Sequence, residues 1–587
     1  MRPVNAKLLL ALLSTLNSLA HAELSRQTIF KSSGSLPSDK LIRTQWDFAD
    51  QPSINSTSHL VFNTVDSLLQ HWPNTRYRNG HNIIPATIPV GTLLYHGTYK
   101  QEVPNVPEWV ATDPEHSYLF CRSLNETSGC WQLTLVTTRP LKVLYFDGSS
   151  AAKMFGGPMD SQDLAIWGEV KPERTMQEKE RIVEICKWGE QYGLDGFLSE
   201  IMLCDFTAGV QTASFVSLAP ARGGPPKWNP PPQDDAHPKP SSPHPPTRSP
   251  MFYATLYRVM ESGSWHNHFP GDIRIVLDYS RLISFYDTAT FPSLQTPRFG
   301  QKRLEHRLDK ISKDDAKVLQ ARLKEALLET AEGSGSGVNW KGLMKVVTNR
   351  YAERLEVLQY ILNSTASSTS RLDADINIKK AHRHIRSMLV PYTLYSAVPP
   401  ERGDALRTDS QSWAAPVFEL CATMHTSYMD SAAFANLMTP SESVILDSVK
   451  GVTKEICRVL VGMWAEGMEY GLSDPEVDTY QSLQGESSQN SQELITRWST
   501  KVANLMGWLD WSHWLRCRPA CSYEEMCYLP TWPFIFSKKP FPKLLPGSFM
   551  SWIEEPRHMP GDKGVWDEDR WEDPQPMCVR RVEPFAP

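Results

Sequence analysis

The sequence predicts an α+β protein with a mixed α/β N-terminal domain, a proline-rich linker and a largely helical, disulfide-containing C-terminal domain. Short β-rich runs alternate with helical spacing up to residue 206, and long apolar stripes at helical spacing follow residue 300. Between them, eleven prolines fall within residues 223–250. We therefore expect a leader over 1–22, domains over 23–222 and 251–587, and a linker over 223–250.

The charge balance narrows the class of protein. The 587 residues carry 60 Lys plus Arg against 66 Asp plus Glu, a formal charge of −6. A nucleic-acid binder needs a concentrated basic face, so this near-neutral balance argues against that class. Charged residues at 21% and hydrophobic residues at 41% argue against wholesale disorder.

The N-terminus has the pattern of a secretory leader. A basic start with Arg2 and Lys7 precedes an apolar run, and Ala20-His21-Ala22 resembles a cleavage site. The alternative is an N-terminal membrane anchor, but the run is far shorter than the roughly 20 apolar residues that cross a bilayer. We expect cleavage after Ala22, a secreted protein and no membrane span.

Cysteines and glycosylation sequons agree with export. The ten cysteines, four before the proline-rich stretch and six after it, favour disulfides within each half. Sequons begin at Asn55, Asn125 and Asn363, and we expect all three asparagines to be glycosylation sites.

Residues 223–250 are expected to form an extended spacer. Proline fixes φ, and the stretch has little apolar surface to bury. The alternative is a proline-rich docking ligand for a partner domain.

The first domain is expected to alternate strands and helices. Gly91–Thr98 and Pro107–Thr112 predict strands, and a helix begins near Asp113 and carries Tyr118. Two more β-rich runs, residues 131–137 and 141–146, predict adjacent strands. Helical spacing covers 176–192 before Gly193, and Phe197–Asp205 predicts one strand with Glu200 inside it.

The second domain begins with the strand-like runs 251–260 and 273–286 and then becomes helical. Leucines from Leu304 to Leu327 make one apolar stripe. Another helix is expected to start at Thr439-Pro440-Ser441-Glu442, a capping box with proline at the first helical position.

The ordered motifs His96-Gly97, Trp109-Val-Ala-Thr112 with Tyr118, and Leu198-Ser-Glu200-Ile201 resemble the ADP-ribosyltransferase superfamily. The resemblance is to its His-Tyr-Glu branch, which includes the poly(ADP-ribose) polymerase catalytic fold, and it covers residues 90–206. It implies that NAD is the substrate, that ADP-ribose passes to a macromolecular acceptor or to water, and that His96, Tyr118 and Glu200 are catalytic. His96, Gly97 and Tyr118 would bind NAD.

The residue types suit this chemistry. Cleaving the nicotinamide–ribose bond builds oxocarbenium character, which a fixed carboxylate such as Glu200 stabilises. An aromatic ring offers a face to nicotinamide, His96 can bond to a ribose hydroxyl, and Gly97 permits close backbone approach.

Each residue also has a structural interpretation. His96 could be a satisfied buried histidine, Tyr118 ordinary helix packing, and Glu200 could face solvent. The alternative function is a non-catalytic secreted protein that uses the scaffold to bind a partner. The paired histidines at 266 and 268 and at 382 and 384 lack nearby ligands, so we expect no metal.

Overall fold

The structure is a computed structural model that describes residues 46–118, 120–121, 129–152, 156–198, 201–218, 258–328, 335–364, 371–397, 399, 411–472, 490–531 and 574–583. The chain forms two compact units. The helical unit comprises Met1–Pro52, Ile361–Asn436 and Thr453–Lys501. The α+β unit comprises Ser53–Tyr360, Leu437–Val452 and Val502–Pro587.

The largest sheet of the α+β unit is built around β1 (Asn82–Ile88). Its path is β10 (Ile283–Ser284), β1, β5 (Leu141–Phe146), β6 (Gly196–Leu198), β7 (Ile201–Leu203) and β3 (Glu108–Val110), and β9 (Val276–Leu277) also pairs with β1. Among the described strands of this sheet, β5 and β6 pair in parallel and the other pairs are antiparallel. All but one residue of β1 is buried, as expected for a central strand.

A proline explains why residues 273–286 form two short strands rather than a long one. β9 pairs with Ala86 and Thr87, and β10 pairs with Asn82 and Ile83. The gap between them falls at Pro85, which has no N–H to donate to a ladder. The 3₁₀ turn Tyr279–Arg281 joins the two strands.

A second sheet consists of β2 (Leu93–Thr98), β4 (Cys130–Thr137) and β8 (Val210–Leu218), in the order β2-β4-β8. The expectation that residues 131–137 and 141–146 form adjacent strands is wrong, because β4 belongs to this sheet and β5 to the larger one. Arg139-Pro140 lies where the chain passes between the sheets. A third sheet pairs β11 (Glu525–Tyr528) with β12 (Met577–Arg580).

The compact units do not coincide with the expected division at the proline-rich stretch. β9 and β10 follow that stretch in sequence, yet both pair with β1. The core also mixes the two segments, since Ile83 and Phe146 pack in one cluster with Phe285 and Leu319. Residues 223–250, like residues 1–22, lie outside the described part of the chain.

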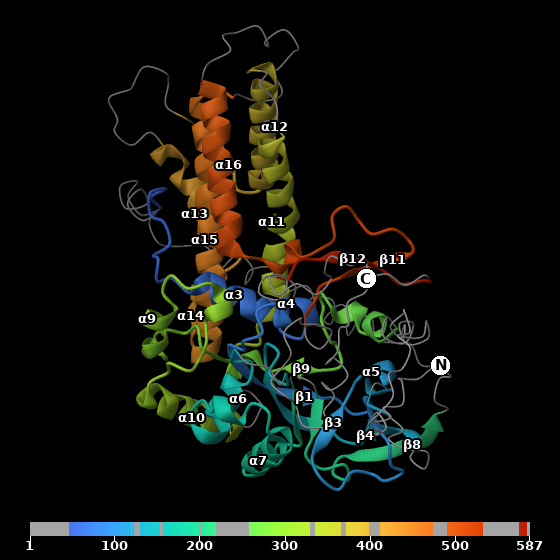
Figure 1. Cartoon of the computed structure of the whole chain (residues 1–587). Coiled ribbons are helices and arrows are strands. Elements are labelled where there is room, and N and C mark those ends of the chain that lie inside the picture. Colours follow the sequence, from blue (N-terminus) through green and yellow to red (C-terminus); the bar gives the residue numbers. More distant parts are fainter. Residues whose placement is uncertain are drawn as a thin grey trace, which may run out of the picture. The chain divides into compact units, whose positions relative to one another are not determined.

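Helices α6 (Asp160–Trp167), α7 (Glu178–Glu190) and α10 (Lys313–Leu328) cover one face of the large sheet (Figure 1). They contribute Leu164, Ile185 and Leu323 to its core. α10 contains the C-terminal half of the expected leucine stripe, while Leu304 lies in a separate 3₁₀ turn. Other α-helices that the structure describes in this unit include α3 (Ser58–Asp66), α4 (His71–Thr75), α5 (Pro114–Tyr118), α9 (Gln295–Arg298) and most of α11 (Trp340–Asn363).

The helical unit contains α12 (Arg371–Leu389), α13 (Ala415–Thr423), α14 (Ala432–Ala435) and large parts of α15 (Pro440–Glu469) and α16 (Asn490–Leu509), several of which run side by side in Figure 1. α15 packs against its neighbours through specific bonds. Thr453 donates to the carbonyl of Ala422 at 2.9 Å, and His382 contacts the carbonyl of Trp464 at 3.1 Å.

The predicted capping box at the start of α15 is confirmed. The Glu442 amide donates to Thr439 Oγ1 at 3.1 Å, and the Thr439 amide donates to a Glu442 carboxylate oxygen at 3.0 Å. Pro440 occupies the first helical position, where its missing N–H costs nothing.

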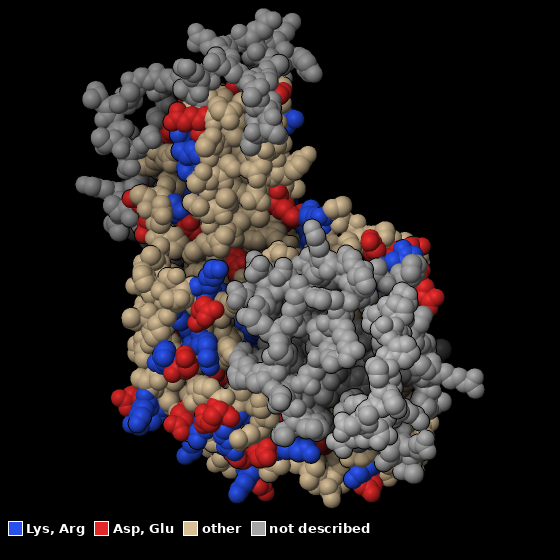
Figure 2. Space-filling model, viewed as in Figure 1, with Lys and Arg blue, Asp and Glu red and all other residues tan. Residues whose placement is uncertain are grey.

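All ten cysteines are paired, and each disulfide lies on one side of the proline-rich stretch, as predicted. The pairs are Cys121–Cys130, Cys186–Cys204, Cys421–Cys457, Cys517–Cys527 and Cys521–Cys578. Among the described helices, none combines the length and the apolar character that a bilayer crossing needs. Basic and acidic side chains are interspersed on the described surface seen in Figure 2.

Candidate functional site

His96 lies in the middle of β2, opposite Leu133 of β4. Its Nδ1 is 2.7 Å from the carbonyl oxygen of Trp109. A carbonyl can only accept, so Nδ1 carries the proton and Nε2 is left as an acceptor. The ring also meets Phe206 edge-on, with centroids 5.5 Å apart.

His96 is held in its neutral form. Burial lowers its pKa, although the Trp109 hydrogen bond and the charge of Glu108 act in the opposite direction. At neutral pH the side chain therefore presents Nε2 as a hydrogen-bond acceptor, in a fixed tautomer and a fixed orientation.

Gly97 is needed for packing between β2 and α5. A Cβ at this position would lie 2.0 Å from the carbonyl oxygen of Ser117, which is much closer than van der Waals contact. The sequence predicts that glycine here lets a ligand approach, but the close neighbour in the structure is the backbone of α5. That packing brings the helix that carries Tyr118 against the strand that carries His96.

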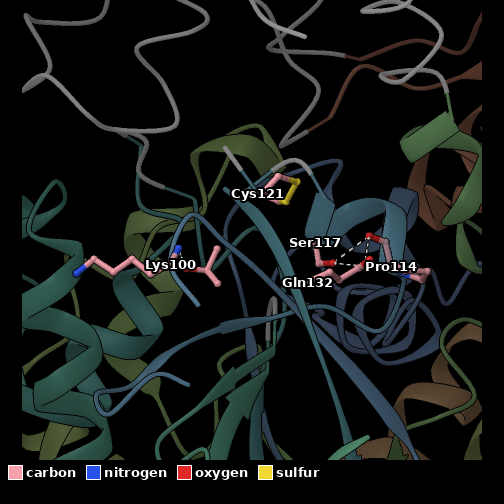
Figure 3. Close-up of a disulfide and its surroundings, with 7 residues drawn as sticks. Lys100, Pro114, Ser117, Cys121 and Gln132 are labelled. Atoms are coloured by element: carbon pink, nitrogen blue, oxygen red, sulfur yellow. Dashed lines mark hydrogen bonds between the residues drawn. A yellow bond between two sulfur atoms is a disulfide. The ribbon is translucent and has the colours of Figure 1, made fainter. Parts of the chain in front are cut away.

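The disulfide Cys121–Cys130 joins the end of this helix region to β4 (Figure 3). Beside it, the Gln132 side chain donates to the Ser117 hydroxyl at 3.0 Å and to the Pro114 carbonyl at 3.1 Å. These bonds connect β4 to α5 directly. The position of α5 is thus determined by a glycine contact, a disulfide and two side-chain hydrogen bonds.

The turn between β3 and α5 is held by Arg274. Its guanidinium donates to the Thr112 carbonyl at 2.6 Å and pairs with Asp113 at 3.1 Å and Asp272 at 2.8 Å. Burial alone would raise the pKa of Asp113, but bonds from His266 and Arg274 lower it to about 2. The Asp113 carboxylate therefore stays charged. Arg274, which is far away in the sequence, holds the second motif in place through it.

Sequence reasoning did not identify Arg274, Asp272 or Phe206 as neighbours of the motifs. Arg274 and Asp272 lie about 160 residues after Thr112. Nothing in their local sequence indicates this pairing, since it follows from β9 and β10 joining the large sheet. The pairing also uses His266, whose partner Asp113 is 3.5 Å away, whereas His268 packs edge-on against Trp72.

Tyr118 is the last residue of α5 and is half-buried. Glu200 lies outside the described residues. The single strand expected over Phe197–Asp205 is wrong, because β6 and β7 pair antiparallel with Leu198 opposite Ile201. The apolar composition suits both arrangements, since every residue of the two short strands is buried.

The strands that bear the three motifs are consecutive neighbours. Tyr95, beside His96, exchanges two 2.8 Å backbone hydrogen bonds with Ala111, which directly follows β3. On its other edge β3 pairs with β7, where Val110 is opposite Ile201. Ile201 is the residue that follows Glu200, so the chain enters β7 one strand away from the Tyr95–Ala111 bridge.

A small cavity lies beside Trp109. Its lining includes Trp109, Arg181, Phe197 and Met202, and its volume is about 20 Å³, enough for about one water molecule. Trp109 Nε1 also donates to Glu178 of α7 at 3.2 Å, so the indole is fixed across the gap between β3 and α7.

Three cysteine sulfurs, those of Cys517, Cys521 and Cys527, lie within 4.8 Å of one another. All three are oxidised in disulfides, and a cysteine must be a free thiolate to hold a metal. The grouping is therefore two adjacent disulfides.

Two of the three expected glycosylation asparagines are described. Asn55 and Asn363 are both exposed, and the side-chain oxygen of Asn363 accepts from Ser499 at 2.9 Å. Asn125 lies outside the described residues.

Residues 49–134 and 122–223 match the family described as the YPL277C N-terminal domain. The uncharacterized protein YOR389W of Saccharomyces cerevisiae is 26% identical over 559 aligned residues, covering 81% of this chain and 82% of that protein. The uncharacterized protein YPL277C of the same yeast is 34% identical over 205 residues, covering 26% of this chain and 41% of that protein. No solved structure matches the chain significantly. The family match covers all three motifs of the candidate site.

Proposed function

We propose that this protein is a secreted glycoprotein whose candidate site binds NAD and cleaves the nicotinamide–ribose bond, passing ADP-ribose to a macromolecular acceptor or to water. His96, Tyr118 and Glu200 are the proposed catalytic residues. The observation that carries the proposal is the strand order β2, Ala111, β3, β7, which lets three motifs distant in sequence contribute to one site.

The tautomer of His96 supports a role in binding ribose. Its Nδ1 proton is committed to the Trp109 carbonyl at 2.7 Å, so Nε2 can accept a hydrogen bond from a sugar hydroxyl. Because its pKa is lowered, the ring does not compete by protonating near neutral pH. A histidine held in this way orients a hydroxyl without adding positive charge beside the developing oxocarbenium ion.

The chemistry assigned to Glu200 follows from the charge that develops on the sugar. As the bond to nicotinamide lengthens, positive charge builds on the ribose, and a nearby carboxylate stabilises that charge. The pairing of Ile201 with Val110 supports this assignment, because Ile201 directly follows Glu200 in sequence and Val110 belongs to the second motif.

Aromatic side chains would bind the nicotinamide ring. Tyr118 ends the helix that packs on Gly97, and Trp109 lies on the strand whose carbonyl orients His96. Stacking on one such ring contributes about 1 kcal/mol beyond buried area.

A second candidate function is non-catalytic binding of a partner by the same scaffold. The size of the cavity beside Trp109 favours it, because about 20 Å³ cannot hold a nicotinamide ring unless the surrounding chain moves. In that case His96 and Tyr118 would be packing residues, and NAD would stay intact.

Nicotinamide release from NAD distinguishes the two functions. We expect the purified secreted protein to release nicotinamide and Glu200→Gln to lower the rate at least about 100-fold, since a single charge-stabilising group is worth this much. The matched control is Glu190→Gln, which changes an exposed glutamate at the end of α7 and should leave the rate unchanged.

Equal rates for Glu200→Gln and the wild type would contradict the catalytic role of Glu200. A wild-type protein that binds NAD but releases no nicotinamide would favour the non-catalytic function. Intact-mass analysis of the same secreted material tests the glycoprotein proposal, which requires added glycan mass that Asn55→Gln reduces.

A further inference from the structure

The α+β unit contains a second, much larger concavity. This cleft has a volume of about 860 Å³, within the range of small-molecule sites. It lies between the start of α3, residues 76–77, residues 294–306 around α9, and residues 507–510 at the end of α16. None of the residues of the candidate site around His96 lines it.

The half-buried carboxylate of Asp510 in the cleft is already fully engaged. Asp510 pairs with Arg76 at 2.9 Å and with Arg303 at 3.2 Å, and it accepts a hydrogen bond from the Tyr77 hydroxyl at 2.5 Å. These three donors use both carboxylate oxygens. Asp510 therefore has little capacity left to compensate other positive charges in the cleft.

Arg298 is a buried cation of the cleft for which the described residues provide no counter-ion. Its side chain lies over the ring of Tyr286, and its Nη1 donates to the Phe285 carbonyl at 2.6 Å. Nε and Nη2 have no hydrogen-bond partner, although the residue is only 8% exposed. Among the residues that the structure describes, no carboxylate forms an ion pair with it. A buried guanidinium with unpaired N–H groups and no counter-ion is unfavourable unless a bound anion supplies the missing acceptor and the opposite charge.

The lining as a whole has excess positive charge. Four cationic side chains (Arg76, Arg298, Lys302 and Arg303) face two acidic ones (Glu305 and Asp510), an excess of two. The histidines of the cleft do not offset this. Burial and the charge of Arg298 lower the pKa of His306 to about 4, so it stays neutral at physiological pH.

We propose that this cleft is a binding site for a small anionic molecule whose phosphate or carboxylate group is held by Arg298 and Lys302. Guanidinium groups bind both kinds of oxyanion through paired N–H donors, and the exposed Lys302 adds a mobile charge at the rim. The rings of His59 and Trp508, with centroids 4.5 Å apart, provide an apolar wall for the rest of the ligand.

Isothermal titration calorimetry on the full chain, at constant ionic strength, tests the proposal. The titrants are inorganic phosphate, adenosine monophosphate and citrate, with sodium chloride as the reference salt. We expect saturable one-site binding of at least one of them. Binding of phosphate and adenosine monophosphate identifies a phosphate ligand, and binding of citrate alone identifies a carboxylate ligand.

Two variants localise the binding. Lys302→Glu changes an exposed side chain and should preserve the fold, so it is the primary variant, and Arg298→Gln is the second. Each should weaken binding at least about tenfold, the loss expected for one charge-assisted hydrogen bond. The matched control is Lys317→Glu on α10, an exposed lysine outside the cleft, which should bind like the wild type.

No saturable binding of any titrant would overturn the proposal. So would Lys302→Glu binding as tightly as Lys317→Glu, because the anion would then be held elsewhere. The readout is binding of a titrant other than NAD, so failure here is separate from failure of nicotinamide release.

Discussion

One charged side chain of the helical unit, Glu466, and one of the α+β unit, Arg298, are held in different ways. In the helical unit, Glu466 of α15 accepts from Arg497 and Trp498 at 2.7 Å each and from Lys501 at 3.1 Å. In the α+β unit, Arg298 donates to one backbone carbonyl and leaves Nε and Nη2 without partners. A satisfied network serves stability, whereas an unsatisfied buried cation indicates a ligand.

Two glycines, one in each unit, also differ in what surrounds them. β2 and α5 meet through backbone atoms at Gly97, where a Cβ would lie 2.0 Å from a carbonyl oxygen. In the helical unit, a Cβ at Gly462 of α15 would meet side-chain atoms, the ring edge of Phe48 at 3.3 Å and Gln411 Oε1 at 4.0 Å. These two contrasts, a satisfied carboxylate against an unsatisfied guanidinium and a side-chain contact against a backbone contact, can each be tested by substitution.

Gly97→Ala has the largest expected effect. The new methyl would collide with the Ser117 carbonyl, which a disulfide and two hydrogen bonds hold in place, so we expect a loss of about 3 kcal/mol in unfolding free energy. Gly462→Ala is the counterpart in the helical unit, and its change should stay within about 1 kcal/mol because a side chain can shift and alanine favours helix. Urea denaturation of both variants measures the two losses in unfolding free energy. Equal losses would contradict the claim that Gly97 is more tightly packed than Gly462.

Glu466→Gln should cost about 2 kcal/mol, because it removes the charge that three donors share. Burial alone would raise the pKa of Glu466, but Lys501 and the Trp498 hydrogen bond lower it overall. A carboxyl with a lowered folded pKa stabilises above its unfolded pKa, and this stabilisation is lost as the pH falls through the folded value. Wild-type stability should therefore fall below about pH 4.5 more steeply than that of the variant. If the stability of the wild type and that of the variant fell in parallel with decreasing pH, the three donors would not stabilise the charged form of Glu466.

His306→Gln tests the lowered pKa of His306, which burial and the charge of Arg298 cause together. The pKa of His306 is about 4 when folded and 6.5 in its unperturbed state, so below pH 6.5 the unfolded chain binds a proton that the folded chain does not. The free energy of unfolding therefore decreases as the pH is lowered, by about 1–2 kcal/mol from pH 7 to pH 5 for this residue. Thermal denaturation at both pH values should show a smaller difference for the variant. An unchanged difference would mean that burial and the charge of Arg298 do not hold the pKa of His306 below its ordinary value in the folded chain.

Arg298→Met has the smallest expected effect on stability and gives the sharpest contrast with Glu466→Gln. Methionine keeps the apolar stem and removes a buried charge that lacks a counter-ion, so we expect a change below about 1 kcal/mol when no ligand is bound. Chemical denaturation in chloride buffer without phosphate checks this. A loss as large as that for Glu466→Gln would mean that Arg298 is satisfied within the protein.

Much of the local structure could be predicted from the sequence. The pairing of cysteines within each half follows from the even number of cysteines on each side of the proline-rich stretch. The strand at His96, the helix bearing Tyr118 and the capping box at Thr439 follow from short-range patterns. Such features depend on neighbouring residues, so a local pattern determines them.

The remaining features depend on contacts between distant segments. No local signal indicates that β9 and β10, which follow the proline-rich stretch in sequence, pair with β1, which precedes it. Nor does any local signal indicate that Arg274 donates to Thr112. The β6–β7 pair was missed because a run that is buried on both faces has no alternation to reveal a reversal. The cleft around Arg298 combines four separate segments, which only the fold brings together.

Hydrogen exchange with bound NAD tests the central claim most directly. On the Glu200→Gln variant, which should bind NAD without cleaving it, we expect saturable protection in three peptides, spanning β2, β3 with α5, and β6 with β7. The peptide over residues 295–306 in the Arg298 cleft should be unchanged. Protection absent from all three peptides, or confined to residues 295–306, would contradict an NAD site at His96, Tyr118 and Glu200.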